Sequence, residues 1–276
     1  MVKRTWYLQV NKPNNVADVS ENFLVQLADE LNNDNVTAIV LKGSCARGEA
    51  TLYSDVDLSV FFYDPSKPSQ HKRFYRNGRL ISVSIGTIEQ HRKRFLIPQE
   101  AIFVVPSTRE ARILLDKEGS FEKLQREAHN WTWEPLQKAA NEFACEVMMD
   151  HTEIAIKALR AFLVQDELAL TEMTLLIFLA VSDIVAVQRG ILAYSGNSFF
   201  QQLQEAVGLD TTWTRYHRLI AGIDESPVEK SLEVRGATAL RLYQETANLL
   251  RPVLRTSEHN DVIEQTVIMI EEALTH

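Results

Sequence analysis

The hydrophobic pattern of this chain of 276 residues changes near Asn130, and the change limits the folds that the chain can adopt. Before Asn130, short runs of apolar, β-branched residues alternate with stretches whose apolar residues recur at helical spacing. After it, helical spacing continues, interrupted by short loops with Gly, Asn, Asp or Pro. We therefore expect an α+β chain of two domains. Residues 1–130 should form a mixed sheet flanked by helices, and residues 131–276 a helical bundle.

The elements expected in the first part are short. The β-branched run 36–41 and the alternating run 56–62 predict strands, and Asn77-Gly78 between 74–75 and 80–85 predicts a hairpin. Ser20 is the predicted N-cap of a helix over 19–31. Further predictions are a turn with a short helix over 44–52, helices over 87–95 and 121–128, and strands over 102–105 and 111–115. In the second part, helices are predicted over 134–164, 168–188, 198–206, 232–254 and 261–274.

The segment between the first two strands carries residues with chemical potential, from Lys42 in the order Lys-Gly-Ser-Cys-Ala-Arg-Gly-Glu-Ala-Thr-Leu-Tyr-Ser-Asp-Val-Asp. Gly43 follows a strand, and without a Cβ its backbone can approach a phosphate closely. Ser44 offers a hydroxyl and a backbone N–H where a helix begins, which suits phosphate oxygens. Asp55 and Asp57 are two residues apart at the start of a strand, so both carboxylates face one side. Two adjacent carboxylates suit a Mg²⁺ ion that bridges to a triphosphate.

This segment resembles the signature of the DNA polymerase beta-like nucleotidyltransferases, in which Gly-Ser and a short helix precede Asp-hydrophobic-Asp. The wider organisation is similar to that of the lincosamide and aminoglycoside adenylyltransferases. The resemblance implies that Asp55 and Asp57 are catalytic residues and bind Mg²⁺, and that the nucleotide, ATP in the simplest case, is bound by Gly43, Ser44, Arg47 and Ser54. It also implies transfer of a nucleoside monophosphate to an acceptor hydroxyl on a small molecule such as an antibiotic, or on a protein.

Some residues near the motif have two interpretations. Lys42 and Arg47 flank Gly43-Ser44, where they would balance the charge of a triphosphate. Arg47 could equally form an ion pair with Glu49 or Asp55. Cys45 is expected to fill space in the loop. At the junction of the two parts, Trp131 and Trp133 are expected to pack rather than to stack on a base.

One residue expected from the resemblance is missing. Related enzymes usually carry a third carboxylate on a later strand beside the Asp pair, and the strand over 80–85 should supply it. The polar face of that strand instead has Ser82 and Ser84, and serine cannot accept a proton near neutral pH. Either another residue is the base, for which Glu89 is one candidate, or catalysis is weak or lost. The alternative function is therefore a nucleotide-binding regulator or interaction module.

The first helix of the second part carries an acidic stripe, formed by Glu142, Glu146, Asp150 and Glu153 at helical spacing. One interpretation is a solvated face, with an ion pair between Glu153 and Lys157. The other is a wall of the acceptor site, where the stripe binds a cationic acceptor or supplies the missing base from one of its first three members.

The bulk composition argues against some partners. A net charge of -8 disfavours a broad nucleic-acid-binding surface, which needs clustered cations. Cys45 and Cys145, the two cysteines, show no disulfide pattern. The longest apolar run, 173–187, is shorter than the ~20 residues of a membrane-spanning helix, and residues 1–10 do not resemble a signal peptide. We therefore expect a cytoplasmic protein without extended nucleic-acid contacts and without a membrane partner.

Overall fold

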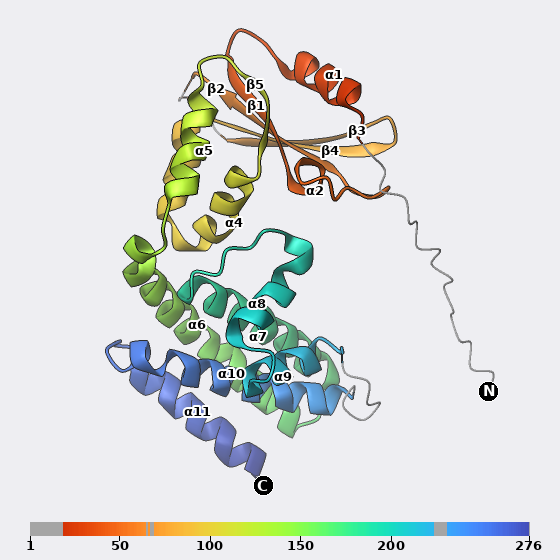
Figure 1. The fold of residues 1–276 in the computed structure, drawn as a ribbon. Helices are drawn as coiled ribbons and strands as arrows, with labels where there is room; N and C mark the ends of the chain where they lie inside the picture. The colour runs from red at the N-terminus through yellow and green to blue at the C-terminus, as the bar shows by residue number, and fades with distance from the viewer. Residues whose placement is uncertain (1–18, 65, 67–68, 224–230, 276) are drawn as a thin grey trace, which may run out of the picture. The chain divides into compact units, whose positions relative to one another are not determined.

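The computed structural model describes residues 19–64, 66, 69–223 and 231–275. Their contacts divide the chain into two compact units: the first holds the described residues up to Lys93 and Ser107–Asn130, and the second holds Arg94–Pro106 and the residues from Trp131 onward. The predicted α+β class is confirmed, because a mixed five-stranded sheet with helices comes first and a helical region follows (Figure 1). A domain boundary at residue 130 stays a prediction, and the contacts group residues 94–106 with the second unit.

The sheet of the first unit has the strand order β3-β4-β2-β1-β5. The strands are β1 (Val36–Lys42), β2 (Val56–Phe62), β3 (Gln70–Arg76), β4 (Arg79–Gly86) and β5 (Arg112–Asp116). β1 is antiparallel to β2 and to β5, and β3 is antiparallel to β4, whereas β2 and β4 run parallel. The strands predicted over 36–41, 56–62 and 111–115 are therefore confirmed.

The predicted hairpin is also present, and it sets the register of the edge strand. Asn77 and Gly78 have φ angles of 51° and 75°, the left-handed values that a two-residue turn between antiparallel strands requires. The turn joins β3 to β4 and places Arg73 opposite Ser82. Because paired residues share a face of the sheet, this register decides which side chains of the hairpin accompany those of β2.

Different helices cover the two faces of the sheet (Figure 1). Helix α1 (Glu21–Leu31), which begins after the predicted cap Ser20, packs its apolar side against the buried residues of β1, β2 and β4. On the other face, Phe61 of β2 contacts His91 of α3 (Ile88–Lys93) and Phe121 of α5 (Ser120–Asn130), each with ring centroids 5.4 Å apart. Side chains alternate along a strand, so Asp57 lies on the same face as Phe61.

The strand predicted over 102–105 is wrong. These residues lie in helix α4 (Pro98–Arg109), which has proline at its first position, where proline is favoured. Ala101, Ile102 and Val105 are buried, which is the spacing of one helical face, and Ile102 belongs to the core of the second unit. A short apolar, β-branched run is compatible with a strand or with a buried helix segment, and packing against the second unit selects the helix.

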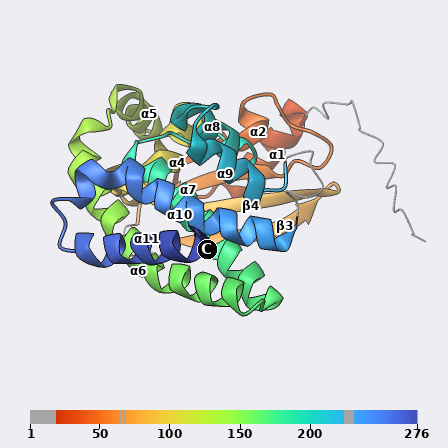
Figure 2. The same ribbon diagram turned by 90° about the horizontal axis from the view of Figure 1, so that it is seen from below.

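The second unit is a helical bundle, in which α6 (Gln137–Leu163) packs against α7 (Glu167–Gln188), α10 (Leu232–Leu254) and α11 (Asn260–Thr275). Figure 2 shows α6, α10 and α11 side by side. The helices predicted for this part are confirmed to within a few residues, including α8 (Phe199–Val207). At the start of the unit, Trp133 packs against Gly190 and edge-on against Trp131, with ring centroids 5.9 Å apart, as expected for a packing role.

Helix α9 (Thr212–Ile220) was not predicted, because its polar residues conceal a buried side. His217 of this helix is fully buried, with Nε2 3.0 Å from Ser182 Oγ and Nδ1 2.9 Å from Gln204 Nε2. The ring of Trp213 stacks on it at 4.9 Å between centroids. Burial lowers the pKa of His217 to about 4, so the imidazole is neutral at pH 7 and serves the core.

Helix α7 is the most apolar helix of the bundle. By length and composition alone it could cross a membrane, but 61% of its most apolar window is buried inside the bundle. A mostly buried core helix passes the same test, so this helix is weak evidence for a membrane span. The absence of a membrane partner stays a prediction.

Candidate functional site

The Gly-Ser and Asp-x-Asp residues lie at one end of two paired strands. β1 ends at Lys42, the single helical turn α2 (Gly43–Ala46) follows, and β2 begins at Val56. In the register of these strands Lys42 is opposite Asp57. The connection from 43 to 55 therefore returns the two aspartates to the point where the chain leaves β1. Cys45 fills space beneath it, as expected, and donates from Sγ to the carbonyl oxygen of Asp55 at 3.2 Å.

Gly43 and the Asp57 side chain are in close contact. A Cβ added to Gly43 would lie 2.6 Å from Oδ2 of Asp57, closer than the 3.0 Å that real Cβ atoms keep. Gly43 also has a φ of 66°, a left-handed conformation that glycine adopts without steric cost. From the sequence alone, the reason for Gly43 is the close approach of a phosphate. The structure adds a second reason, since the Asp57 carboxylate occupies the space of the missing side chain.

The environment of Asp57 disfavours its negative charge. Burial raises the pKa of this carboxyl above 3.8, and the neighbouring Asp55 raises it further. Lys42, His71 and a hydrogen bond with Ser82 lower the pKa, but the net effect is an increase. Burial and the second carboxylate therefore outweigh the nearby positive charges and the hydrogen bond in setting the pKa of Asp57.

These two aspartates fit a magnesium ion. Mg²⁺ prefers oxygen ligands, keeps several waters, and is commonly held by one or two carboxylates together with substrate phosphates. A cation bound there would relieve the repulsion from Asp55 that raises the pKa of Asp57. No group of three or more His, Cys, Asp or Glu that could hold a metal occurs among the described residues. The pair thus suits a cation that arrives with phosphate ligands, and its role in metal binding stays a prediction.

Ser82 occupies the position beside Asp57 on the neighbouring strand. In the parallel pairing of β2 with β4, Asp57 is opposite Ser82 and Ser59 is opposite Ser84. Ser82 is buried and hydrogen-bonded to Asp57, while the hydroxyl oxygens of Ser59 and Ser84 are 2.7 Å apart. The face of β4 that accompanies Asp57 therefore offers hydroxyl groups where the resemblance led us to expect a carboxylate.

The two other serines of the motif have structural contacts. Ser54 Oγ accepts a hydrogen bond from the backbone N–H of Thr51 at 2.8 Å, which closes the turn before Asp55. The carbonyl oxygen of Ser44 accepts from the backbone N–H of Glu49 at 2.9 Å. Nucleotide binding by Gly43, Ser44 and Ser54 stays a prediction.

Arg47 forms one of the two ion pairs that the sequence left open, with Nε 2.7 Å from Glu49 Oε2. Its second partner is Glu110, whose Oε2 accepts from Arg47 Nη1 at 3.2 Å. Glu110 follows α4 and is 63 residues away along the chain, so no local pattern could reveal it. The pair with Glu110 attaches the loop after Gly43 to the start of β5, and phosphate binding by Arg47 stays a prediction.

The acidic stripe lies on the exposed side of α6. Its members Glu142, Glu146, Asp150 and Glu153 are all exposed, and the expected ion pair joins Glu153 Oε1 to Lys157 Nζ at 2.6 Å. Glu142 and Glu146 also line a recess of about 660 Å³ between α6 and the connection from α10 to α11. The approach of one of these carboxylates to an acceptor stays a prediction. Glu89, the other candidate base, is exposed and paired with Arg92 at 2.7 Å.

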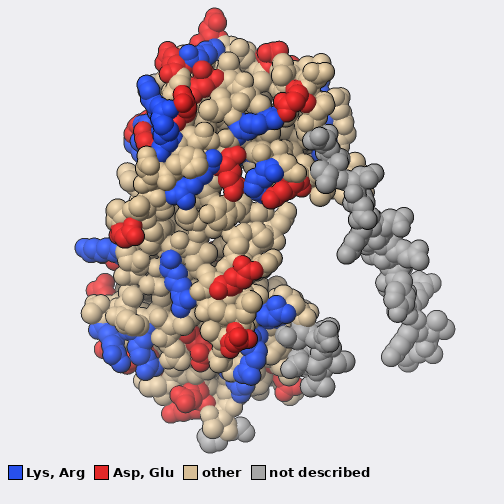
Figure 3. All heavy atoms as spheres, in the orientation of Figure 1, with Lys and Arg blue, Asp and Glu red and all other residues tan. Residues whose placement is uncertain are grey.

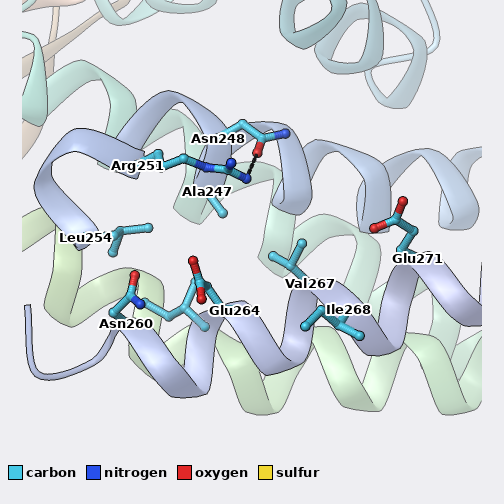
Figure 4. A pocket seen from close by; sticks show the side chains of 10 residues that line it. Ala247, Asn248, Arg251, Leu254, Asn260, Glu264, Val267, Ile268 and Glu271 are labelled. Atoms are coloured by element: carbon cyan, nitrogen blue, oxygen red, sulfur yellow. Dashed lines mark hydrogen bonds between the residues drawn. The ribbon is translucent and has the colours of Figure 1, made fainter.

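A second recess, of about 280 Å³, lies between α10 and α11 (Figure 4). Arg251 donates to Asn248 Oδ1 at 2.8 Å on one wall, and Glu264 and Glu271 lie on the other. It contains none of the residues that the sequence singled out. Because Arg251 is already hydrogen-bonded to Asn248, we assign no function to this recess.

One comparison with known proteins, with family models, covers the segment that holds the Asp pair. Residues 24–154 match the family model described as the nucleotidyltransferase domain. None of the curated proteins matches the chain. A similar solved structure is the crystal structure of a nucleotidyltransferase-like protein from Exiguobacterium sibiricum 255-15. It is 18% identical, with 91% of this chain and 88% of that chain covered and a TM-score of 0.39.

Proposed function

We propose that this chain, whose residues 24–154 match the model of the nucleotidyltransferase domain, transfers a nucleoside monophosphate to an acceptor hydroxyl. The nucleotide donor is ATP in this proposal, and the acceptor is a small molecule such as an antibiotic, with a protein side chain as the second possibility. The observation that carries the proposal is the contact of the Asp57 carboxylate with Gly43, at the end of β1, with Asp55 beside it.

In this proposal the chain contributes position and charge. Gly43 and Ser44 place backbone and hydroxyl groups near the triphosphate, and Lys42 and Arg47 supply positive charge there. Asp55 and Asp57 hold Mg²⁺, which supplies neutralisation of the charge on the triphosphate. The acceptor oxygen forms a bond to the α-phosphorus, the bond to the pyrophosphate oxygen breaks, and the hydroxyl proton must pass to a base. Ser82 cannot be that base, and the base is left open: Glu89 and the acidic stripe of α6 are candidates, and the stripe could equally be a solvated face.

A second function is favoured by one observation. Ser82, beside Asp57 in the register, leaves the strand next to the Asp pair without a carboxylate. A chain that binds a nucleotide but lacks a base could act as a nucleotide-binding regulator or interaction module. The two functions share the nucleotide site and differ in the proton-accepting group.

Two measurements in parallel separate these functions. The affinity for ATP is measured by calorimetry with and without Mg²⁺, and transfer is followed with α-labelled ATP and a broad panel of acceptors. Transfer of label to any acceptor, lost in Asp57→Asn, supports the enzyme. Binding that depends on Mg²⁺ without transfer supports the regulator. Absence of binding in the unaltered protein contradicts both.

A further inference from the structure

The edge strand β3 is a cationic segment in an acidic chain. Between Gln70 and Arg79 the sequence contains four cations and a histidine but no acidic residue, although the whole chain has a net charge of -8. All seven residues of β3 are exposed. Figure 3 shows Lys and Arg mixed with Asp and Glu over the coloured part of the visible face. A local excess of positive charge is therefore a distinct feature of β3. Charged side chains on an edge strand often serve to prevent pairing with another chain. Whether those of β3 also bind a ligand depends on where they lie relative to the Asp pair.

The register connects Arg73 of β3 to the Asp pair. Arg73 is opposite Ser82, and Ser82 is opposite Asp57, so the three residues form one row on one face of the sheet. Neighbouring strands are about 4.8 Å apart, which puts the Arg73 backbone about 10 Å from that of Asp57, within reach of one bound ligand. His71 lies on the same face, opposite Ser84, and its charge lowers the pKa of Asp57. Lys72 faces the other side.

The cations of the hairpin differ in their contacts. Arg76 forms an ion pair with Glu30, and Arg79 donates to the carbonyl oxygens of Thr51 and Ser54 at 3.2 and 3.3 Å. Among the residues that the structure describes, neither Arg73 nor Lys72 takes part in an ion pair. Among the three arginines of the hairpin, Arg73 is therefore the one that lies on the same face of the sheet as Asp57 and forms no ion pair with a described residue.

The proposed reaction requires the acceptor on this side of Asp57. The loop of Gly43 and Ser44, proposed to contact the triphosphate, adjoins β1, and β1 and β4 lie on opposite sides of β2. In phosphoryl transfer the attacking and leaving oxygens are roughly in line. An acceptor that attacks opposite the pyrophosphate thus approaches over β4 and β3.

We infer that Arg73, assisted by His71, binds a phosphate group carried by the acceptor. A guanidinium matches the geometry of phosphate with two parallel hydrogen bonds. Tyr75, on the same face and 75% exposed, offers a ring to the adjoining part of the acceptor. The inference rests on the proposed function and narrows it, because a phosphorylated acceptor is favoured here over a cationic one. The phosphate could belong to a small phosphorylated alcohol or to the end of a nucleic acid.

The test titrates defined probes into the protein saturated with Mg²⁺ and a non-transferable ATP analogue. The probes are ribose 5-phosphate, ribose as its neutral counterpart, and an RNA hexamer. We expect a phosphate-bearing probe to bind and ribose not to bind, and the better of the two phosphate probes identifies the source of the phosphate. Arg73→Gln should lower the affinity for that probe by about tenfold or more, because it removes the charge-assisted, two-point hydrogen bonding to the phosphate.

Lys72→Gln is the matched control, because it removes one positive charge from the adjacent, equally exposed position on the opposite face. It should change probe affinity by less than about twofold, and neither variant should change MgATP affinity by more than that. Equal effects of the two variants, or no probe binding to the unaltered protein, would refute the inference. Weaker MgATP binding in Arg73→Gln with unchanged probe binding would assign Arg73 to the triphosphate instead. If the unaltered protein fails to bind MgATP, the proposed function fails separately, and the probes are titrated without nucleotide.

Discussion

Replacing Gly43 by alanine tests the geometry on which the proposed site depends. Gly43 and Gly48 belong to the same connection and have similar φ angles, 66° and 71°. In both, alanine must adopt a left-handed conformation that costs about 1–2 kcal/mol. A Cβ at Gly48 has nothing within 4 Å, whereas a Cβ at Gly43 lies 2.6 Å from Asp57 Oδ2. The two substitutions therefore share a backbone cost and differ in the contact with the carboxylate.

The size of the required movement follows from these distances. An ordinary van der Waals contact begins at 3.4 Å, so Oδ2 must move by about 0.8 Å, the difference between 3.4 and 2.6 Å. Ligand distances in metal sites tolerate only about ±0.2 Å. Gly43→Ala should therefore lose Mg²⁺-dependent ATP affinity by tenfold or more, which corresponds to about 1.4 kcal/mol.

Calorimetry with and without Mg²⁺ measures the affinity, and thermal melting measures the shared cost. Both variants should melt lower, by about 2–4 °C for each kcal/mol lost in a chain of this size, and Gly48→Ala should keep its affinity for MgATP. If Gly43→Ala bound MgATP as tightly as Gly48→Ala, the position of the Asp57 carboxylate beside Gly43 would not matter for holding the ion. The metal assignment would then be wrong.

Four further predictions address the Asp pair, the base and the core. Asp55→Asn and Asp57→Asn should each weaken Mg²⁺-dependent ATP binding by at least about tenfold, because an amide keeps the shape but loses the charge that holds the ion. In the absence of Mg²⁺ neither variant should have a lower melting temperature, because the substitution removes a repelling charge. Unchanged affinity in both variants would contradict the metal assignment. If the acidic stripe supplies the base, at least one of Glu142→Gln, Glu146→Gln and Asp150→Asn should lower turnover by about 10² or more. The matched control is Glu153→Gln, because the Glu153 carboxylate pairs with Lys157. Full turnover in all three variants would show that the stripe is a solvated surface. Ser82→Asp should raise turnover in the presence of Mg²⁺ and lower the melting temperature in its absence. If the variant folds and binds MgATP but its turnover is unchanged or lower, the missing acid does not limit the reaction. The pKa of His217 falls from 6.5 to about 4 on folding, so the unfolded chain binds the proton first as the pH falls. The free energy of unfolding, which is at its full value above about pH 6.5, should therefore decrease by about 2 kcal/mol between pH 7 and pH 5. Chemical denaturation at several pH values should show this loss in the unaltered protein and a smaller loss in His217→Gln.

Most first-unit strands were predictable because their patterns are local, whereas of β3 (Gln70–Arg76) only residues 74–75 were expected. The runs of β1 and β2 are apolar and β-branched, and Asn77-Gly78 specifies a hairpin whose register follows from the turn. The helix over 102–105 was not predictable in this way, because its residues suit a strand locally. Only the burial of Ile102 in the core of the second unit selects the helix, and such packing leaves no trace in a short window.

The arrangement of the motif was predictable where its residues are close in sequence. Gly43 and Asp55 lie in the connection from β1 to β2, Asp57 lies at the start of β2, and the structure brings Gly43 and Asp57 into contact. Glu110 was missed because its contact with Arg47 joins segments 63 residues apart. The position of Arg73 was missed for a related reason: its alignment with Asp57 emerges only when the registers of two strand pairs are combined.

The serine beside Asp57 weakens the case for catalysis less than it first suggests. In the proposed site, nucleotide binding would depend on the Asp pair and on phosphate contacts, and neither involves a base. A general base contributes about 10²–10⁴ in rate, whereas positioning and preorganised charge usually supply the larger share of an enzyme's acceleration. A chain that keeps the Asp pair and lacks the acid should therefore be a slow enzyme more readily than an inert one. The position of Ser82 also disfavours an acid there. Ser82 is buried, and a third carboxylate at this position would add to the burial and the repulsion that already raise the pKa of Asp57. The metal-free protein should therefore be more stable with serine at this position than with aspartate.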